Sequence, residues 1–144
     1  MSGVKLTDIV EKMNLKNLTP EVDITEREVL VPDVNRPALQ LAGFFDHFDL
    51  NRVQIIGNVE CAYLEALAEE KRVEIYQKLL EHKVPCIIFS NELQPDESFI
   101  EIAQKNDIPV FGTCKKTSSF MGELIRWLNV KLAPCISIHG VLVD

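Results

Sequence analysis

Basic residues are scarce in this sequence. Its 144 residues include 15 Lys and Arg against 22 Asp and Glu, which gives a formal net charge of −7. A protein that binds nucleic acid nonspecifically needs a basic surface that displaces counterions from the phosphates. The composition therefore argues against a nucleic-acid partner.

Long apolar runs are also missing. The uncharged runs, such as 84–91, are about ten residues long, whereas a membrane-spanning helix needs roughly 20 apolar residues. Residues 1–8 contain no apolar core and no small-residue cleavage site, so no signal peptide is expected. These absences predict a cytoplasmic protein with no membrane partner.

Cysteine is sparse, and its spacing suits no metal. Cys61, Cys86, Cys114 and Cys135 form no CxxC or CxH pair, so the sequence predicts no zinc or other metal site. Three of these cysteines lie in or beside apolar runs, as reduced and buried thiols usually do. With 47% hydrophobic and 26% charged residues, the chain is typical of one globular domain that needs no disulfide for its core.

From residue 52 onward, short apolar runs alternate with amphipathic stretches. Strands are expected at 53–56, 85–89 and 110–111, and helices at 60–68, 71–82, 95–108 and 117–132. Strands that alternate with helices of this length imply right-handed crossovers and a mostly parallel sheet. Because the strands are apolar on both faces, we expect an α/β fold with helices on both faces of the sheet.

The first fifty residues show a less regular pattern. A short helix is expected over 7–14, with Thr7 as its N-cap. A strand is expected at 28–31, and Pro37 suits the first turn of a short helix that ends at Leu41. The sequence of this region predicts no ligand-binding or catalytic site.

Polar residues follow the expected strands. The pairs 57–58, 90–91 and 112–113 end three of them, at the edge of a parallel sheet where ligands bind. At the same edge, 115–119 opens the longest helix with ammonium groups, hydroxyls and free N–H groups that could hold a phosphate. The candidate ligand-binding residues are Asn58, Ser90, Asn91, Thr113, Lys115, Lys116, Thr117 and Ser118. Turn preferences and helix capping explain the same residues without a ligand, and both interpretations stay open.

Signatures of catalysis are absent. The six glycines fit neither GxGxxG nor GxxxxGK[ST], and no GxSxG or HExxH pattern occurs. His139 ends an apolar run beside Gly140. Taken alone, this histidine is more often structural than catalytic.

Three blocks resemble the N-terminal domain of the bacterial HPr kinase/phosphorylase family, also called HPr serine kinases. They are Asn-Arg-Pro-Ala-Leu-Gln-Leu-Ala-Gly-Phe-Phe-Asp at 35–46, Arg-Val-Gln-Ile-Ile-Gly at 52–57, and Leu-Ala-Pro followed by His-Gly-Val-Leu-Val-Asp within 132–144. The resemblance extends over essentially the whole chain. It implies a two-domain enzyme that phosphorylates a serine of the phosphocarrier HPr with ATP or pyrophosphate. The same enzyme removes that phosphate by phosphorolysis in carbon catabolite repression.

The resemblance also implies a division of the chain. Residues 1–133 are expected to form the N-terminal α/β domain, similar to the UDP-binding N-terminal domain of Mur ligases. Residues 134–144 are expected to be a connector strand to a catalytic domain that this chain does not include. That domain carries the phosphate loop, the catalytic lysine and the acid/base aspartate of the family. Among the family's active-site positions, only one maps here, onto His139.

The resemblance also implies cofactors and partners. ATP and Mg²⁺ are expected of the longer enzyme, together with HPr as partner and a homo-oligomeric state. For this chain alone we expect no cofactor and no catalysis. Two other hypotheses remain. The chain could be a stand-alone module that senses a small anion or nucleotide sugar at the sheet edge, or an assembly domain with an exposed apolar face.

Overall fold

A mostly parallel five-stranded sheet forms the centre of the computed structural model, which describes residues 3–133. The strand order is β2-β7-β6-β5-β4. These strands are β2 (Lys16–Asn17), β4 (Val34–Asn35), β5 (Val53–Ile56), β6 (Ile87–Phe89) and β7 (Val110–Gly112). Strands β4 to β7 are parallel, and β2 pairs antiparallel with β7. The prediction that 53–56, 85–89 and 110–111 are parallel neighbours is confirmed.

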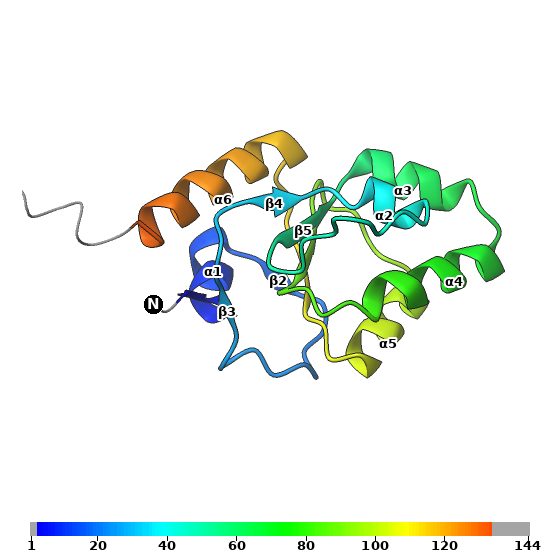
Figure 1. The fold of residues 1–144 in the computed structure, drawn as a ribbon, viewed down its shortest axis with the longest axis horizontal. Coiled ribbons are helices and arrows are strands. Elements are labelled where there is room, and N and C mark those ends of the chain that lie inside the picture. Colours follow the sequence, from blue (N-terminus) through cyan, green and yellow to red (C-terminus); the bar gives the residue numbers. More distant parts are fainter. Residues whose placement is uncertain (1–2, 134–144) are drawn as a thin grey trace, which may run out of the picture.

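Helices cover both faces of this sheet, as the apolar strands predicted (Figure 1). On one face lie α1 (Leu6–Met13) and α6 (Thr117–Lys131). On the other lie α3 (Asn58–Glu65), α4 (Glu69–Leu80) and α5 (Glu97–Lys105). The short α2 (Ala38–Leu41) follows β4. None of the helices in the part of the chain that the structure describes is long and apolar enough to span a membrane.

Alternate strand residues divide the core into two layers. Val53 and Ile55 of β5 pack with α1 and α6, whereas Ile56 packs with α3, α4 and α5. Residues of β6 and β7 alternate in the same way, because successive side chains of a strand point to opposite faces. The central strands are therefore buried on both sides.

The first fifty residues contribute more to the sheet than their sequence indicates, because β2 and β4 form its two edges. The strand expected at 28–31 is β3 (Glu28–Val29), which pairs with β1 (Val4–Lys5) outside the main sheet.

The N-cap prediction for Thr7 is wrong, since α1 begins at Leu6 and Lys5 is the capping residue. Helix ends are the least certain part of a sequence prediction. The α3 and α4 helices both begin two residues before their expected starts at 60 and 71, and α5 begins at Glu97 instead of residue 95.

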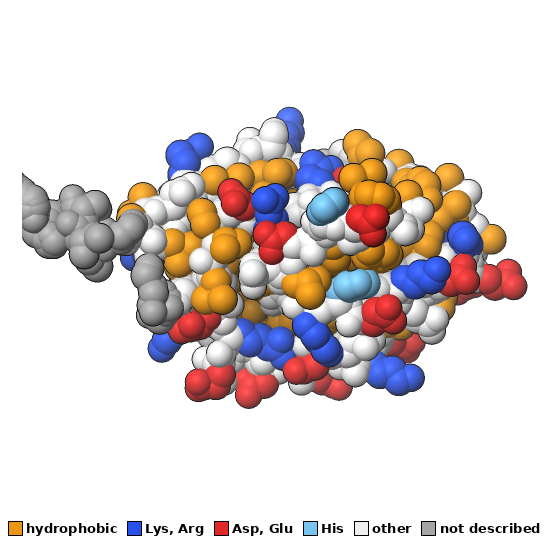
Figure 2. Space-filling model, in the orientation of Figure 1, with side chains coloured by type: hydrophobic (Ala, Val, Ile, Leu, Met, Phe, Trp, Pro, Cys, Tyr) orange, Lys and Arg blue, Asp and Glu red, His pale blue; other side chains and the backbone are white. Residues whose placement is uncertain are grey.

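An exposed apolar surface lies over α2 and α3 (Figure 2). Leu39 of α2 is 62% exposed and Val59 of α3 is 69% exposed, and Phe44 and Tyr63 are also exposed. Single exposed apolar residues are ordinary, but a contiguous group often marks a contact surface. This is the kind of face that the assembly-domain interpretation requires.

Candidate functional site

The carboxyl edge of the sheet is crossed by the segment that leads from β7 to α6. The Thr113 N–H donates to the Phe89 carbonyl at 2.9 Å, and the Asn91 N–H donates to the Lys115 carbonyl at 2.8 Å. Both bonds hold the segment against the end of β6. At the end of this crossing, the first residue of α6, Thr117, lies against Gly57 at the end of β5. A Cβ atom at Gly57 would lie 2.7 Å from the Thr117 hydroxyl oxygen.

Two of the candidate hydroxyl groups satisfy each other. The Ser90 Oγ and Thr117 Oγ1 atoms are 2.5 Å apart, and Ser90 is fully buried. The Ser90 hydroxyl is also 3.4 Å from the Ile56 carbonyl oxygen. These bonds join the ends of β5 and β6 to the start of α6. A polar group placed in the interior needs such a partner.

An ion pair that the sequence analysis missed completes this edge. Glu60 is 2% exposed, and its Oε1 atom accepts the Gly57 N–H at 2.8 Å and the Arg36 Nη2 at 2.6 Å. A carboxylate at the third helical position commonly accepts the N–H of the capping residue, so the spacing of Gly57 and Glu60 was an available signal. Arg36 lies 24 positions away, and no local pattern pairs it with Glu60.

The lysines of the candidate site have different surroundings. The Lys115 Nζ atom donates to the Glu123 Oε1 atom at 2.7 Å, and this hydrogen bond lowers the pKa of the Glu123 carboxyl. Lys116 is the N-cap residue of α6 and forms no side-chain capping bond. Lys116 and Ser118 are exposed, as is Asn58 at the start of α3.

The eight predicted residues therefore form two groups. Ser90, Asn91, Thr113, Lys115 and Thr117 take part in the bonds that join the strand ends to the segment before α6. Asn58, Lys116 and Ser118 face solvent. Ligand binding by either group stays a prediction. His139 and the connector at 134–144 lie outside the described residues, as does Cys135.

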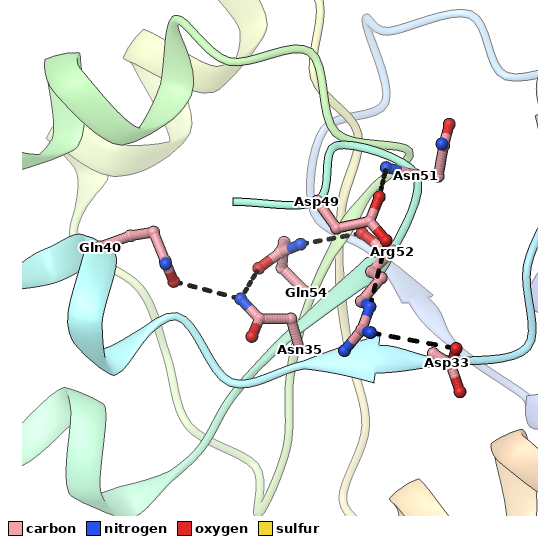
Figure 3. Close-up of polar contacts among 7 residues, drawn as sticks. All are labelled: Asp33, Asn35, Gln40, Asp49, Asn51, Arg52 and Gln54. Atoms are coloured by element: carbon pink, nitrogen blue, oxygen red, sulfur yellow. Dashed lines mark hydrogen bonds and ion pairs between the residues drawn. The ribbon is translucent and has the colours of Figure 1, made fainter. Parts of the chain in front are cut away.

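A partly buried amide network begins at Asn35, the first residue of the Asn35-Arg36-Pro37 block (Figure 3). The Asn35 Nδ2 atom donates to the Gln54 Oε1 at 2.7 Å and to the Gln40 Oε1 at 3.2 Å. Gln54 is fully buried and donates in turn to the Arg52 carbonyl at 2.9 Å. The network ties β4 to β5 and α2. Next to it, Arg52 contacts the exposed Asp49 at 3.3 Å.

The described cysteines differ in burial, so the expectation of buried thiols holds only in part. Cys86 is fully buried, Cys61 is partly buried and Cys114 is exposed. Burial raises the pKa of the Cys86 thiol to about 12. Burial, followed by the charges of Glu65, Glu60 and Asp96, raises the pKa of the Cys61 thiol to about 11.

These surroundings predict the order in which the three thiols within residues 3–133 react. Because the thiolate is the nucleophile, iodoacetamide at about pH 8 should modify Cys114 first, Cys61 slowly, and Cys86 only after unfolding. The rate at Cys61 should keep rising with pH up to about 11. Peptide mass spectrometry of timed samples measures each site, with urea-unfolded protein as the control. Equal rates at Cys61 and Cys114 in the folded protein would contradict this order.

Comparison with known proteins gives one family. The family model described as "HPr Serine kinase N terminus" matches residues 4–128. Similar proteins include the HPr kinase/phosphorylase of Lachnoclostridium phytofermentans, which is 56% identical over 144 residues, covering 100% of this chain and 47% of that protein. The HPr kinase/phosphorylase of Caldicellulosiruptor bescii is 40% identical over 136 residues, covering 94% of this chain and 44% of that protein. The chain thus spans less than half the length of these relatives.

One solved structure shares the fold. It contains the CBS and DRTGG domains of the regulatory region of Clostridium perfringens pyrophosphatase, complexed with the activator diadenosine tetraphosphate. The TM-score is 0.61 with 22% sequence identity, and the match covers 87% of this chain and 47% of that one. At this identity, the likeness concerns the α/β fold alone.

Proposed function

Because the chain belongs to the family of HPr serine kinase N-terminal domains, we propose that it serves as the noncatalytic N-terminal part of an HPr kinase/phosphorylase. The longer protein would phosphorylate a serine of HPr with ATP or pyrophosphate, with Mg²⁺, and would remove the phosphate by phosphorolysis. This activity would act in carbon catabolite repression in the cytoplasm. HPr would be its partner, and the full-length enzyme a homo-oligomer.

One observation carries this proposal. The whole chain matches relatives named HPr kinase/phosphorylase, yet it spans only 47% of the one from L. phytofermentans. Phosphoryl transfer depends on groups that position the phosphates and neutralise their charge, and the sequence contains no GxxxxGK[ST] motif to supply them. At the sheet edge, Arg36 is paired with Glu60 and Lys115 with Glu123. Both cations thus already have carboxylate partners in the same chain, which agrees with a supporting role.

The first test is the activity of the chain alone. Incubation with HPr, ATP and Mg²⁺ should yield no phosphoserine above the level of HPr alone, because the chain lacks the phosphate-binding machinery. Phosphoserine is measured by mass spectrometry of intact HPr. The full-length relative from L. phytofermentans serves as the positive control, and turnover by a clean preparation of the 144-residue chain would contradict the proposal.

A second candidate function is the sensing of a small anion or nucleotide sugar at the sheet edge. It is favoured by the start of α6, where Lys116 and Ser118 are exposed and no side chain caps the helix. Free N–H groups at a helix start attract phosphate, and a nearby ammonium group strengthens the attraction.

Titration with inorganic phosphate or a sugar phosphate tests this candidate. A bound anion should shift the amide resonances of Thr117 and Ser118, and Lys116→Gln should weaken the effect severalfold. Lys131→Gln, at the opposite end of α6, is the matched control because it removes the same charge from an exposed position. Shifts confined to residues 3–50, or equal effects of the two variants, would count against the sheet edge.

A further inference from the structure

A small cavity lies on the opposite side of α3 from the exposed surface, between α3, α4 and the start of α5. Its volume is about 140 Å³, close to the roughly 150 Å³ of an engineered apolar cavity that binds benzene. Buried side chains of Leu64, Phe89 and Phe99 line it, and the exposed residues Glu65 and Asp96 lie at its polar margin. The cavity can take one ring-sized group whose polar end remains near solvent.

Three aromatic rings contribute to the apolar lining. Phe99 makes edge-to-face contacts with Tyr76 and Phe89, with ring centroids 5.1 Å and 5.2 Å apart. Aromatic faces carry partial negative charge and attract cations, including organic ammonium ions. A lining of this kind suits an apolar body that carries a positive charge.

The charged groups around the cavity are mainly acidic. Its only lining cation among the described residues, Arg72, donates to the Asp96 Oδ2 at 3.1 Å and to the Leu67 carbonyl at 2.8 Å. The Tyr76 hydroxyl donates to the same Oδ2 atom at 2.6 Å. Within residues 3–133, the Asp96 Oδ1 atom accepts no hydrogen bond and Glu65 forms no ion pair. Acceptors for a donor group therefore remain.

Carboxylates outnumber cations among the residues that line the cavity, and they affect the Cys61 thiol. The charges of Glu65, Glu60 and Asp96 all add to burial in raising the pKa of Cys61. A cation entering the cavity is consequently favoured over an anion of the same shape.

From the cavity size, the aromatic lining and the unpaired carboxylate oxygens, we propose that this cavity binds a small organic ammonium ion. Its apolar body packs against Phe99 and Leu64, and its ammonium group donates hydrogen bonds to Asp96 and Glu65. The site is separate from the sheet edge around Thr117, and its occupancy does not depend on the proposed function.

Benzylamine and benzyl alcohol form the decisive pair of probes, because they share a ring and differ in the charge of the head group. Benzylamine should shift the amide resonances of Leu64, Phe89 and Phe99 and bind about tenfold more tightly than benzyl alcohol, as a hydrogen bond to a charged group allows. Equal affinities of the two probes, shifts located elsewhere, or no shifts at millimolar benzylamine would overturn the proposal.

Variants of residues that line the cavity test where the ammonium group and the ring of benzylamine bind. Glu65→Gln should lower the affinity for benzylamine about fivefold and leave the affinity for benzyl alcohol unchanged. Glu69→Gln, at an exposed position that does not line the cavity, should change neither affinity. Cys61→Phe should fill the cavity and block both probes, whereas Ala62→Phe, the exposed neighbour on α3, should not. The glutamate pair remains decisive if Cys61→Phe does not fold, and equal behaviour of Glu65→Gln and Glu69→Gln would overturn the assignment.

Discussion

Replacing Arg36 with Met should lower the free energy of unfolding by about 3 kcal/mol, because Glu60 is left buried without its cationic partner. Glu60 is 2% exposed, and its Oε1 atom lies 2.6 Å from the Arg36 Nη2. The measurement is urea unfolding followed by circular dichroism. Arg52→Met is the matched control, since its partners Asp49 and Asp33 are exposed and such surface pairs contribute about 1 kcal/mol or less.

A double-mutant cycle separates the buried charge from the loss of packing. Glu60→Gln keeps an oxygen that can accept the Gly57 N–H but carries no charge. The double variant Arg36→Met/Glu60→Gln should therefore be more stable than Arg36→Met alone. If the double variant and Arg36→Met are equally stable, the loss of stability arises from the lost packing of the Arg36 side chain and not from the uncompensated carboxylate.

Truncation of Phe120 to Ala should lower the free energy of unfolding by about 3 to 5 kcal/mol, which is the usual cost of removing a fully buried aromatic ring. Phe120 is 0% exposed and lies in the core layer between α6 and the sheet, with Leu124 and Leu128. Because α6 also carries Thr117, a loosened helix would also weaken the bond between Thr117 and Ser90.

Phe44→Ala is the control for this truncation, because Phe44 is 48% exposed and surface substitutions usually change stability by less than about 1 kcal/mol. Urea unfolding measures both variants, and a common m-value shows that the same cooperative unit unfolds. Similar losses for Phe44→Ala and Phe120→Ala would contradict the assignment of α6 as a core helix.

The parallel sheet could be predicted because its signal is local. Strands β5, β6 and β7 are short and consist mainly of Val, Ile and Phe, with Gln54 in β5 and Gly112 at the end of β7. Such apolar strands alternating with helices are typical of a sheet whose two faces are both covered. The helix expected over 117–132 is α6, and its apolar residues lie at helical spacing: Phe120, Leu124 and Leu128 are buried, and Met121 and Ile125 are partly buried. Hydrophobic periodicity over ten or more residues is sufficient for such elements.

The sheet edges carry no comparable signal. Strands β2 and β4 have two residues each, too few to show a period. Their pairing depends on the strands that they meet, Phe111 and Gly112 for β2 and Val53 and Gln54 for β4. Short strands form where a neighbour offers backbone hydrogen bonds, so their positions emerge only when the chain is folded.

In the candidate site, too, local features could be predicted from the sequence and contacts between distant residues could not. Turn and capping chemistry within a few residues predicted that polar groups would follow the strands, as Ser90 and Thr113 do. The sequence could not show that Ser90 meets Thr117, or that Arg36 meets Glu60, because these partners lie 27 and 24 positions apart. Long-range pairing of buried polar groups is a consequence of packing two helix starts against the strand ends. Local chemistry thus establishes the elements and their order, whereas the contacts between distant side chains, including those that form the aromatic cavity, arise from tertiary packing.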